Sequence, residues 1–526
     1  MRPRVLKLGT RRSALARAQS AAVARELEQY HAGLEVELVG IETRGDRIQD
    51  RPLSSVEGKE FFTAEIDTAL LDGVVDFTVH SYKDLSLERT ARLRLAAVPA
   101  RQRPHDLVIF ARDVPERLAG GCELVIGTSS PRRMSFVPDF LQRMLPRAAA
   151  GAAPTRIRLV DLRGNVDSRQ RRLHEPRGSA RQLDGIVLAF AGLARLWADE
   201  AGRPLLEQLF RPLPRMLLPL SACPAAPAQG ALGIECRAED AHTAQLLTAI
   251  DHAATRRAVD CERALLAERG GGCHQRFGAT QIEVPDLGTL LYLREGAGEA
   301  QLRWTPCVPL AAPQGAIHAW DGSRAERAAV EPIATGIASS LQCLPGTEAL
   351  FVAHARALPQ DADALINSGA HIWVPGLSTW QRLAERGLWV EGCAEGLGFA
   401  LLEPLLREPL LGLPALARWT VLTHEDAAGG WDAGQVIATY RQREDSADAA
   451  AAADAAAAGD AAGPPVDATH LYWHSSAQFE RWRTRVRGPA QHACGPGKTH
   501  QHLLRARVQN LQMFPSADQW RSWLAL

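Results

Sequence analysis

One short stretch of the chain, Val79-His80-Ser81-Tyr82-Lys83-Asp84-Leu85, places an ammonium directly beside a carboxylate. Lysine is rare here, because the 60 basic residues include only Lys7, Lys59, Lys83 and Lys498. A chain that otherwise uses arginine keeps a lysine where a compact, mobile ammonium is needed, and a carboxylate beside it can stabilise positive charge or move protons. The alternative interpretation is a surface ion pair of little energetic value.

Arginines recur where predicted strands end. Ser130 is a good helix N-cap and Pro131 suits the first helical position, so the arginines that follow would stand beside free N–H groups that bind anions. The alternative is an ordinary capped helix with exposed arginines. Because ligands of α/β sheets bind beyond the carboxyl ends of the strands, these arginines predict a ligand with many carboxylates or phosphates. They are Arg11, Arg12, Arg44, Arg132, Arg133, Arg163, Arg169 and Arg195.

A cysteine stands on a glycine turn, Gly270-Gly271-Gly272-Cys273-His274. Three glycines let the backbone bend sharply and would leave the sulfur accessible, whereas a buried, inert cysteine is the alternative. The nine cysteines are odd in number and form no C-x-x-C pair, which argues against a disulfide framework and a clustered zinc site. We therefore expect no metal and a reducing, cytoplasmic location.

The elements that must position these residues alternate between strands and helices. Such a rhythm predicts parallel or mixed sheets covered by helices. The expected order in the first part is strand 4–10, helix 14–30 opened by Ser13, strand 34–41, helix 61–71 and strand 74–80.

A second unit of the same kind starts near Asp106. Its expected strands lie at 123–127, 156–160 and 185–190. Residues 224–237 then form a crossover whose short final strand returns to the first unit. A helix at 240–269 and small strands at 290–304 complete this part.

The C-terminal part contains an internal repeat. Ala349–Ala355 resembles His470–Ser476, and Pro375-Gly376-Leu377-Ser378 resembles Pro496-Gly497-Lys498-Thr499. Each copy leads into a predicted helix and then a strand, so we expect two similar α/β lobes with a ligand between them. Further strands are expected at 419–423 and 436–441, and a low-complexity linker at 446–466.

Length and composition narrow the function classes. The 526 residues suffice for about three to four domains, and 46% hydrophobic and 23% charged residues are ordinary for a globular protein. The zero net charge gives no general reason to expect nucleic acid or an anionic membrane as a partner. We see no signal peptide and no apolar run of about 20 residues, and we expect a monomer that binds a small molecule.

The first 345 residues resemble the hydroxymethylbilane synthase (porphobilinogen deaminase) family. Eight motifs occur in the order that this family shows, and together they are specific although each alone is weak. They are Thr10-Arg11-Arg12-Ser13, Thr43-Arg44-Gly45-Asp46, Gly58-Lys59, His80-Ser81-Tyr82-Lys83-Asp84, Gly127-Thr128-Ser129-Ser130, Leu162-Arg163-Gly164-Asn165, Gln229-Gly230-Ala231 and Gly271-Gly272-Cys273.

The resemblance implies an α/β fold with two periplasmic-binding-protein-like lobes and a small α+β cofactor domain. It places the first domain at 1–104 and 213–237, the second at 105–212 and the third at 238–345. It also implies a dipyrromethane cofactor joined by a thioether to Cys273. Four porphobilinogen molecules would be condensed onto this primer with loss of ammonia, before hydrolysis releases hydroxymethylbilane.

The resemblance also assigns site residues. Asp84 would be catalytic, because its carboxylate could stabilise positive charge on a pyrrole nitrogen and shuttle protons. Arginines would neutralise the acetate and propionate groups of the growing product. The implied cofactor-binding residues are Cys273, Lys83, Ser129, Arg132, Arg133 and Asp46. The implied substrate-binding residues are Arg11, Ser13, Lys59, Arg163, Arg169, Arg195, Thr128 and Ser81.

The chain departs from the family pattern at four places. Leu85-Ser86 follows the aspartate, Glu60-Phe61 follows the motif lysine, Ser55 stands where the family has a lysine, and His274-Gln275-Arg276 follows the cysteine. The aspartate, the cysteine and most of the arginines are retained.

Residues 346–526 are similar to the uroporphyrinogen-III synthase family, through the two Gly-x-Ser/Thr turns, Tyr440-Arg441 and His474-Ser475-Ser476. That family has two α/β lobes and closes hydroxymethylbilane with inversion of its last ring. The resemblance implies Tyr440, Ser476 and Thr499 as contacts, and a degenerate, non-catalytic domain is the alternative. For the whole chain the rival is a two-lobed anion- or solute-binding protein without catalysis.

Overall fold

The computed structural model divides the chain into two compact units. Unit 1 comprises 1–148, 152–283 and 290–303, and unit 2 comprises 149–151, 284–289 and 304–526. The residues that the structure describes are 4–43, 63–149, 151–210, 213–272, 275–313, 315–322, 330–333, 348–359, 369–429, 431, 433–442 and 463–526. Most of the expected low-complexity linker at 446–466 therefore lies outside the described residues.

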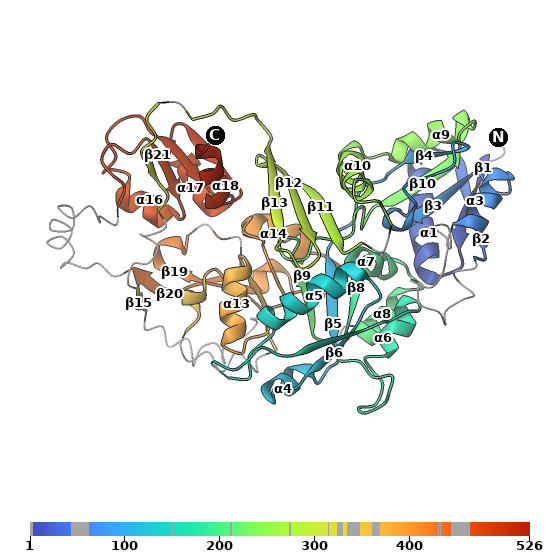
Figure 1. Ribbon diagram of the computed structural model, residues 1–526, viewed down its shortest axis with the longest axis horizontal. Coiled ribbons are helices and arrows are strands. Elements are labelled where there is room, and N and C mark those ends of the chain that lie inside the picture. The colour runs from blue at the N-terminus through green and yellow to red at the C-terminus, as the bar shows by residue number, and fades with distance from the viewer. Residues whose placement is uncertain are drawn as a thin grey trace. The chain divides into compact units, whose positions relative to one another are not determined.

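The first sheet of unit 1 has the strand order β2-β1-β3-β10-β4 (Figure 1). The first three strands are parallel, and β10 runs antiparallel to both of its neighbours. The predicted return of the chain to this sheet is confirmed, because β10 pairs along its length with β3. The strands are β1 (Arg4–Arg11), β2 (Leu34–Ile41), β3 (Phe77–Ser81), β4 (Leu93–Ala97) and β10 (Leu232–Arg237).

Helices α1 (Ala14–Tyr30) and α3 (Ala64–Leu71) cover opposite faces of this sheet. Val36 of β2 belongs to the core that contains Leu27 of α1. Ile41, on the other face of β2, packs with Leu70 of α3. The prediction that Ser13 opens a helix at 14–30 is confirmed, since its Oγ accepts a hydrogen bond from the Ala16 N–H.

The second sheet repeats the pattern of the first, with the order β7-β6-β8-β5-β9. Again three strands are parallel, and an antiparallel strand, β5, stands between the third strand and the last. The strands are β5 (Asp106–Phe110), β6 (Leu124–Gly127), β7 (Ile157–Val160), β8 (Gly185–Ala189) and β9 (Arg215–Leu218). Because β9 pairs with β5, residues 215–218 lie in the second sheet and not in the first, beyond the boundary expected at 213.

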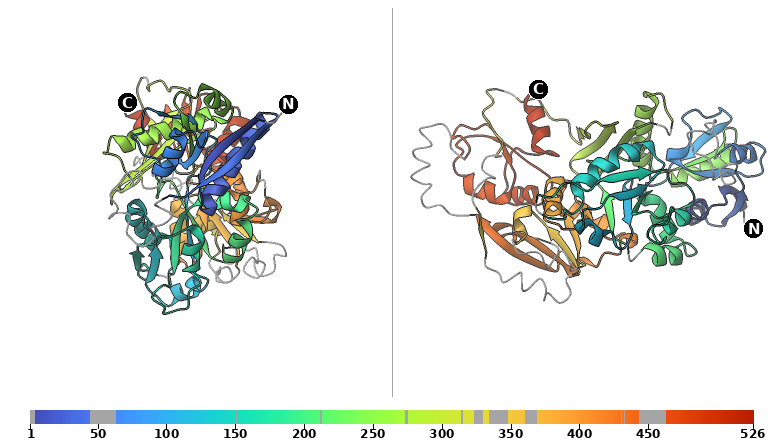
Figure 2. Two further views of the ribbon diagram at one scale, coloured as in Figure 1. Left: turned by 90° about the vertical axis from the view of Figure 1, so that its right-hand side faces the viewer. Right: turned by 60° about the horizontal axis from the view of Figure 1, so that its bottom comes forward.

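Helices flank this second sheet in all views (Figures 1 and 2). The predicted start of α5 is confirmed: Ser130 caps it by accepting a hydrogen bond from the Arg133 N–H, and Pro131 is its first residue. The helices are α4 (Val114–Ala119), α5 (Pro131–Met144), α6 (Val166–Arg171), α7 (Phe190–Ala198) and α8 (Arg203–Phe210).

The expected continuous helix at 240–269 is wrong. It is divided into α9 (Ala241–Leu247), a 3-10 turn at Thr248–Ile250 and α10 (Ala253–Ala267). His252 caps α10 through its Nδ1, and the Asp251 carboxylate accepts a hydrogen bond from the Val98 N–H, so the break connects the helix start to the first sheet. A three-stranded sheet follows, with the order β11-β12-β13: Phe277–Val284, Gly288–Glu295 and Gln301–Pro306.

Unit 2 contains two further sheets. The first has the order β15-β20-β19-β16-β17-β18 and the second β14-β21-β22-β23. The strands are β14 (Ala319–Trp320), β15 (Val330–Pro332), β16 (Ala349–Val352), β17 (His371–Val374), β18 (Gly392–Cys393), β19 (Trp419–His424), β20 (Gln435–Gln442), β21 (His470–Trp473), β22 (Gln491–Cys494) and β23 (Leu511–Met513). The helices are α13 (Leu377–Glu385), α14 (Phe399–Leu406), α16 (Ser476–Trp482), α17 (Lys498–Arg505) and α18 (Ala517–Leu524).

The internal repeat predicted for this part forms equivalent elements in the two sheets. Strands β16, β17 and β18 are consecutive parallel neighbours in one sheet, as β21, β22 and β23 are in the other. Glycine precedes both α13 and α17, as the repeated Pro-Gly turns predict. Among the described residues, no helix is both long and apolar enough to span a membrane.

Candidate active site

The Lys83-Asp84 pair lies on a single 3-10 turn, η2 (Tyr82–Asp84), at the end of β3. The turn follows directly from strand pairing, since Ser81 is opposite Leu232 and the Tyr82 N–H donates to the carbonyl of Ala231. Tyr82 is buried beneath the turn, Lys83 is half-buried and Asp84 is exposed. The exposed carboxylate is therefore presented at the sheet edge where α/β proteins bind ligands.

Gln229 connects this turn to the second sheet. The Nζ of Lys83 lies 3.2 Å from the Oε1 of Gln229, which is completely buried. The Nε2 of Gln229 donates to the Asp106 carboxylate at 2.8 Å and to the Pro104 carbonyl at 2.6 Å. Burial lowers the pKa of Lys83, and its neighbour Asp84 opposes that shift.

Asp106 is the buried anion that holds two of the predicted ligand-binding arginines. Its two oxygens accept hydrogen bonds from Nη2 of Arg132 at 2.8 Å and Nη2 of Arg133 at 2.7 Å. Both guanidiniums also donate to backbone carbonyls, and their side chains are buried. Burial alone would raise the pKa of Asp106, but the two arginines outweigh it and hold this pKa well below its usual range.

Three other predicted arginines, Arg163, Arg169 and Arg195, are half-buried. Arg169 donates from Nε to the Gly164 carbonyl at 2.7 Å, and Arg195 donates from Nη2 to the Gly230 carbonyl at 2.6 Å. Burial lowers the pKa of both to about 10. For Arg169 the charges of Arg133 and Arg163 add to this shift, whereas Asp84 opposes it. The charges of Arg169 and Asp84 therefore lie within electrostatic reach of each other.

The predicted hydroxyl residues hold loops at the strand ends. Ser129 Oγ donates to the Leu162 carbonyl at 2.5 Å and accepts from the Leu162 N–H, which joins the loop after β6 to the loop after β7. Thr128 is buried and its Oγ1 accepts from the Ser130 N–H. Ser81 Oγ bonds to the side chain of Gln19, and Ser13 is the helix cap described above.

The remaining predicted residues are placed differently. Asp46, Lys59 and Cys273 lie outside the described residues. Arg11 is half-buried at the end of β1.

In unit 2, the Tyr440 ring is buried near His354 and His424, with ring centroids 6.4 and 5.8 Å away. In the other sheet, Thr499 Oγ1 donates to the His474 carbonyl, two residues before Ser476.

Two arginines near the site were not predicted from the sequence. Arg101 forms a two-pronged ion pair with Glu262 of α10, with bonds of 2.6 and 3.0 Å. Arg263, the next residue of α10, donates to carbonyls of the turn that carries Asp84. The adjacent Glu262-Arg263 pair was the available signal, but it does not reveal its partners, which lie more than 150 residues away along the chain.

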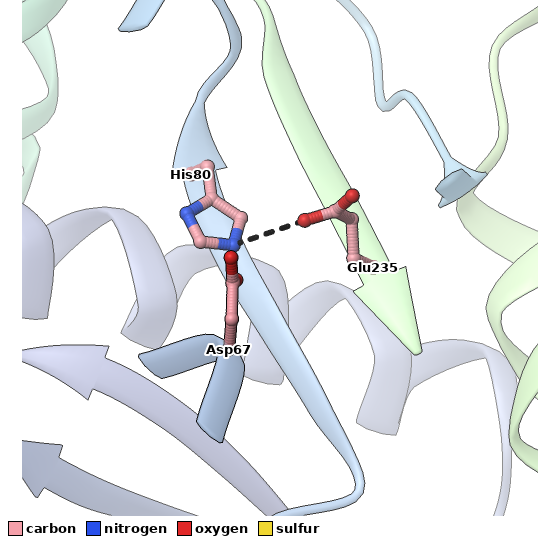
Figure 3. Close-up of side chains that lie close together, drawn as sticks. All are labelled: Asp67, His80 and Glu235. Atoms are coloured by element: carbon pink, nitrogen blue, oxygen red, sulfur yellow. Dashed lines mark ion pairs between the residues drawn. The ribbon is translucent and has the colours of Figure 1, made fainter. Parts of the chain in front are cut away.

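Asp67, His80 and Glu235 have ligand atoms within 4.8 Å of one another, close enough to hold a metal ion (Figure 3). The space between the carboxylates is taken by Arg89, which donates to Asp67 at 2.8 Å and to Glu235 at 2.6 and 2.9 Å. His80 Nε2 lies 3.4 Å from Glu235 Oε2, and burial lowers the pKa of His80 although both carboxylates favour its protonated form. A guanidinium already neutralises these anions, so the cluster connects α3, β3 and β10 as an ion-pair network.

Comparisons with known proteins match the half of the chain that carries this site. The family model "Porphobilinogen deaminase, dipyromethane cofactor binding domain" matches residues 6–245. The porphobilinogen deaminase of Acidothermus cellulolyticus is 39% identical over 293 residues, which cover 54% of this chain and 76% of that protein. Those of Sphingopyxis alaskensis and Mycolicibacterium gilvum are 40% and 42% identical over 280 and 285 residues, covering 52% and 54% of this chain and 78% and 80% of those proteins.

Among solved structures, the methionine-binding protein MetQ aligns with 48% of this chain and 93% of its own, at 13% identity and a TM-score of 0.26. A similarity this low carries no weight for the fold.

Proposed function

This chain belongs to the porphobilinogen deaminase family, and from that premise we propose that it condenses four porphobilinogen molecules, with loss of ammonia, and releases hydroxymethylbilane. The observation that carries the proposal is the connection from Lys83 through Gln229 to Asp106. It connects the turn that carries Asp84 to the buried anion that binds Arg132 and Arg133 of the second sheet. A reaction that builds a polycarboxylate needs a carboxylate catalyst beside a surplus of cations.

The cations suit a substrate with several carboxylates. Porphobilinogen carries an acetate and a propionate, so every addition brings two more anions. Arg169 and Arg195 donate to backbone carbonyls, and their remaining N–H groups would bind these anions. Arg11, Ser13, Lys59, Arg163, Thr128 and Ser81 are the further residues that we assign to substrate binding.

The family cofactor is dipyrromethane. Buried N–H groups without a hydrogen-bond partner among the described residues fit such a polycarboxylate group: the Nε of Arg132, the Nε of Arg133 and the Nη1 of Arg163. We propose that Cys273 holds the cofactor covalently. When bound, dipyrromethane supplies the two linked pyrroles from which synthesis starts. We assign Lys83, Ser129, Arg132, Arg133 and Asp46 to its binding.

Asp84 would act on the reacting pyrrole of the substrate. Loss of ammonia and carbon–carbon bond formation place positive charge on a pyrrole nitrogen, and the Asp84 carboxylate stabilises that charge and accepts the proton that leaves. Lys83 is tied to Gln229, so its role is to bind and position.

The test is the Asp84→Asn variant. We expect it to retain the cofactor, measured as excess intact mass, while porphobilinogen consumption falls by about a hundredfold or more. Normal consumption would remove Asp84 from the catalytic role. An unmodified wild-type mass together with no consumption of porphobilinogen would favour the rival reading of a solute-binding protein.

For residues 346–526 we propose a second activity, cyclisation of hydroxymethylbilane to uroporphyrinogen III. Its support is the repeated strand–turn–helix unit in two sheets, as expected for two lobes around a substrate. Tyr440 lies buried near His354 and His424 at the end of one sheet, and Lys498 starts α17 in the other with a pKa that burial lowers to about 8. We assign Tyr440, Ser476 and Thr499 as contacts.

The product distribution of the full-length chain tests this second activity. Hydroxymethylbilane closes without a catalyst to the type I isomer, so the proposal predicts type III uroporphyrinogen from porphobilinogen. Tyr440→Phe should increase the share of type I. Type I as the sole product of the wild type would show that this region is not a working cyclase.

A further inference from the structure

Arg263 of α10 donates hydrogen bonds to three carbonyls of the segment that carries Asp84. Its Nη1 lies 3.1 Å from the Tyr82 oxygen and 3.0 Å from the Leu85 oxygen, and its Nη2 lies 2.9 Å from the Ser86 oxygen. The guanidinium also stands 4.3 Å from the centroid of the Tyr82 ring. One side chain therefore satisfies backbone acceptors on both sides of Asp84.

Apart from Arg263, this segment is held by the hydrogen bond from the Tyr82 N–H to the Ala231 carbonyl, by the bond from Lys83 to Gln229, and by packing of Tyr82 and Leu85 in an apolar core. Within the turn, the Leu85 N–H donates to the Tyr82 carbonyl at 3.3 Å. The segment also borders a cavity of about 310 Å³, which is lined by Tyr82, Leu85, Leu87 and Arg263 among others. Side chains that border a cavity have fewer packing partners on that side, and the three hydrogen bonds from Arg263 restrain the segment there.

The helix that bears Arg263 is itself fixed. Glu262 is completely buried, pairs with Arg101, and accepts hydrogen bonds from the N–H groups of Ala228 and Gln281 at 2.6 and 2.7 Å. Beyond the helix, Gly271 adopts a φ of +68°, and a Cβ there would lie 2.9 Å from a methyl group of Leu87. Gly271 therefore lies close to Leu87, the residue that follows the segment held by Arg263.

We propose that Arg263 is a positioning residue. It sets the Tyr82–Ser86 segment relative to α10, so that the Asp84 carboxylate meets the substrate assembled from the cysteine that follows this helix. This inference rests on the proposed deaminase function, and it adds a residue that touches neither substrate nor cofactor. A rigid positioner of this type changes the rate of chemistry more than the affinity for substrate.

The experiment compares Arg263→Met, Arg263→Ala and Arg263→Lys in the full-length chain with Arg257→Ala, an exposed arginine on the same helix. We expect all four variants to carry the cofactor mass. In Arg263→Met, kcat for porphobilinogen consumption should fall about a hundredfold, with KM changed less than about threefold. Arg263→Lys, which keeps one cationic donor, should lie between Arg263→Met and the wild type. Arg257→Ala should match the wild type.

Chemical rescue separates positioning from a general loss of structure. Guanidinium chloride at millimolar concentration should raise the rate of Arg263→Ala, because the deleted side chain leaves room beside the cavity. It should not raise the rate of Arg263→Met, in which that space is filled, and sodium chloride should rescue neither variant.

The outcomes separate the inference from the function on which it rests. Rates of Arg263→Met and Arg263→Ala within about threefold of the wild type would overturn the inference alone. So would absence of rescue, or loss of the cofactor mass in all three Arg263 variants. A wild-type chain with neither cofactor mass nor porphobilinogen consumption would instead overturn the proposed function.

Discussion

Gln229 and Asp106 are separated by 123 positions in the chain, yet the Nε2 of Gln229 lies 2.8 Å from the Asp106 Oδ1. The other end of the same amide accepts the hydrogen bond from Lys83. The buried amide of Gln229 therefore donates to an anion of the second sheet, Asp106, and accepts from a cation that follows a strand of the first sheet, Lys83. Removing this amide therefore leaves a polar group without its partner in each of the two sheets of unit 1.

We expect Gln229→Leu to destabilise unit 1 by about 1–3 kcal/mol, because Asp106 and Lys83 each lose a buried partner while the volume is kept. Far-UV circular dichroism in a urea titration measures this change. Gln245→Leu, an exposed substitution on α9, is the control. Equal midpoints for the two variants would contradict the role of Gln229.

Asp106→Asn leaves Arg132 and Arg133 without their shared anion, so we expect a loss of about 3–5 kcal/mol at neutral pH. The folded-state pKa of Asp106 is depressed, so its contribution is complete above the unfolded value of about 3.9 and is lost as pH falls below it. The difference between wild type and variant should therefore shrink below about pH 4. Amide hydrogen exchange of β5 and α5 measures it, and a gap that persists in acid would refute the account.

Arg195→Leu should affect catalysis more than stability. Arg195 is paired with no carboxylate among the described residues, so its removal leaves no buried anion behind. We expect stability to change by less than about 1 kcal/mol, while kcat/KM falls about 10- to 100-fold through loss of a charged contact to substrate. Arg132→Leu, which breaks the pair with Asp106, should instead lower stability. Steady-state kinetics measure kcat/KM of both variants, and thermal melting measures their stability. A loss of stability in Arg195→Leu equal to that in Arg132→Leu would contradict this prediction.

His354 should make unit 2 sensitive to acid. Burial and the charges of Arg356, Arg382 and His424 lower its pKa to about 4. The folded protein therefore favours the neutral form of this imidazole. The stability that His354 contributes is complete above its unfolded value of about 6.5 and is lost as pH falls towards 4.

Tryptophan fluorescence reports on this unit, because Trp197 is the one tryptophan of the twelve that lies in unit 1. The fluorescence-detected melting temperature should fall between pH 7 and pH 5, and less so in His354→Asn. Identical pH dependence in the two proteins would contradict this prediction.

Local signals in the sequence predicted the elements well. Ser13 and Ser130 have side-chain oxygens that cap the following helix, and the predicted helix at 14–30 and strand at 34–41 coincide with α1 and β2. Caps and alternation act over a few residues, which is why single-chain reasoning finds them. The predicted long helix at 240–269 was wrong because the chain breaks it near Asp251. The carboxylate of Asp251 binds the N–H of Val98, which belongs to a distant segment.

Side-chain partners could not be predicted in the same way. Arg132 and Arg133 look like Arg163 and Arg169 in the sequence, since both pairs follow a strand. In the structure the first pair is tied to Asp106, 26 and 27 positions away, and the second is not. Which arginine is neutralised internally depends on tertiary contacts. For the same reason the sequence did not indicate the partners of Gln229, although it lies in a family motif, or the role of Arg263.

The intact mass of the freshly purified full-length protein tests the central claim most directly. The account predicts an excess over the sequence mass equal to two linked pyrroles in the wild type, and its absence in Cys273→Ser. Cys261→Ser, a half-buried cysteine of α10, is the matched control and should keep the excess. A wild-type mass equal to that of the bare chain, or an excess that survives in Cys273→Ser, would contradict the account.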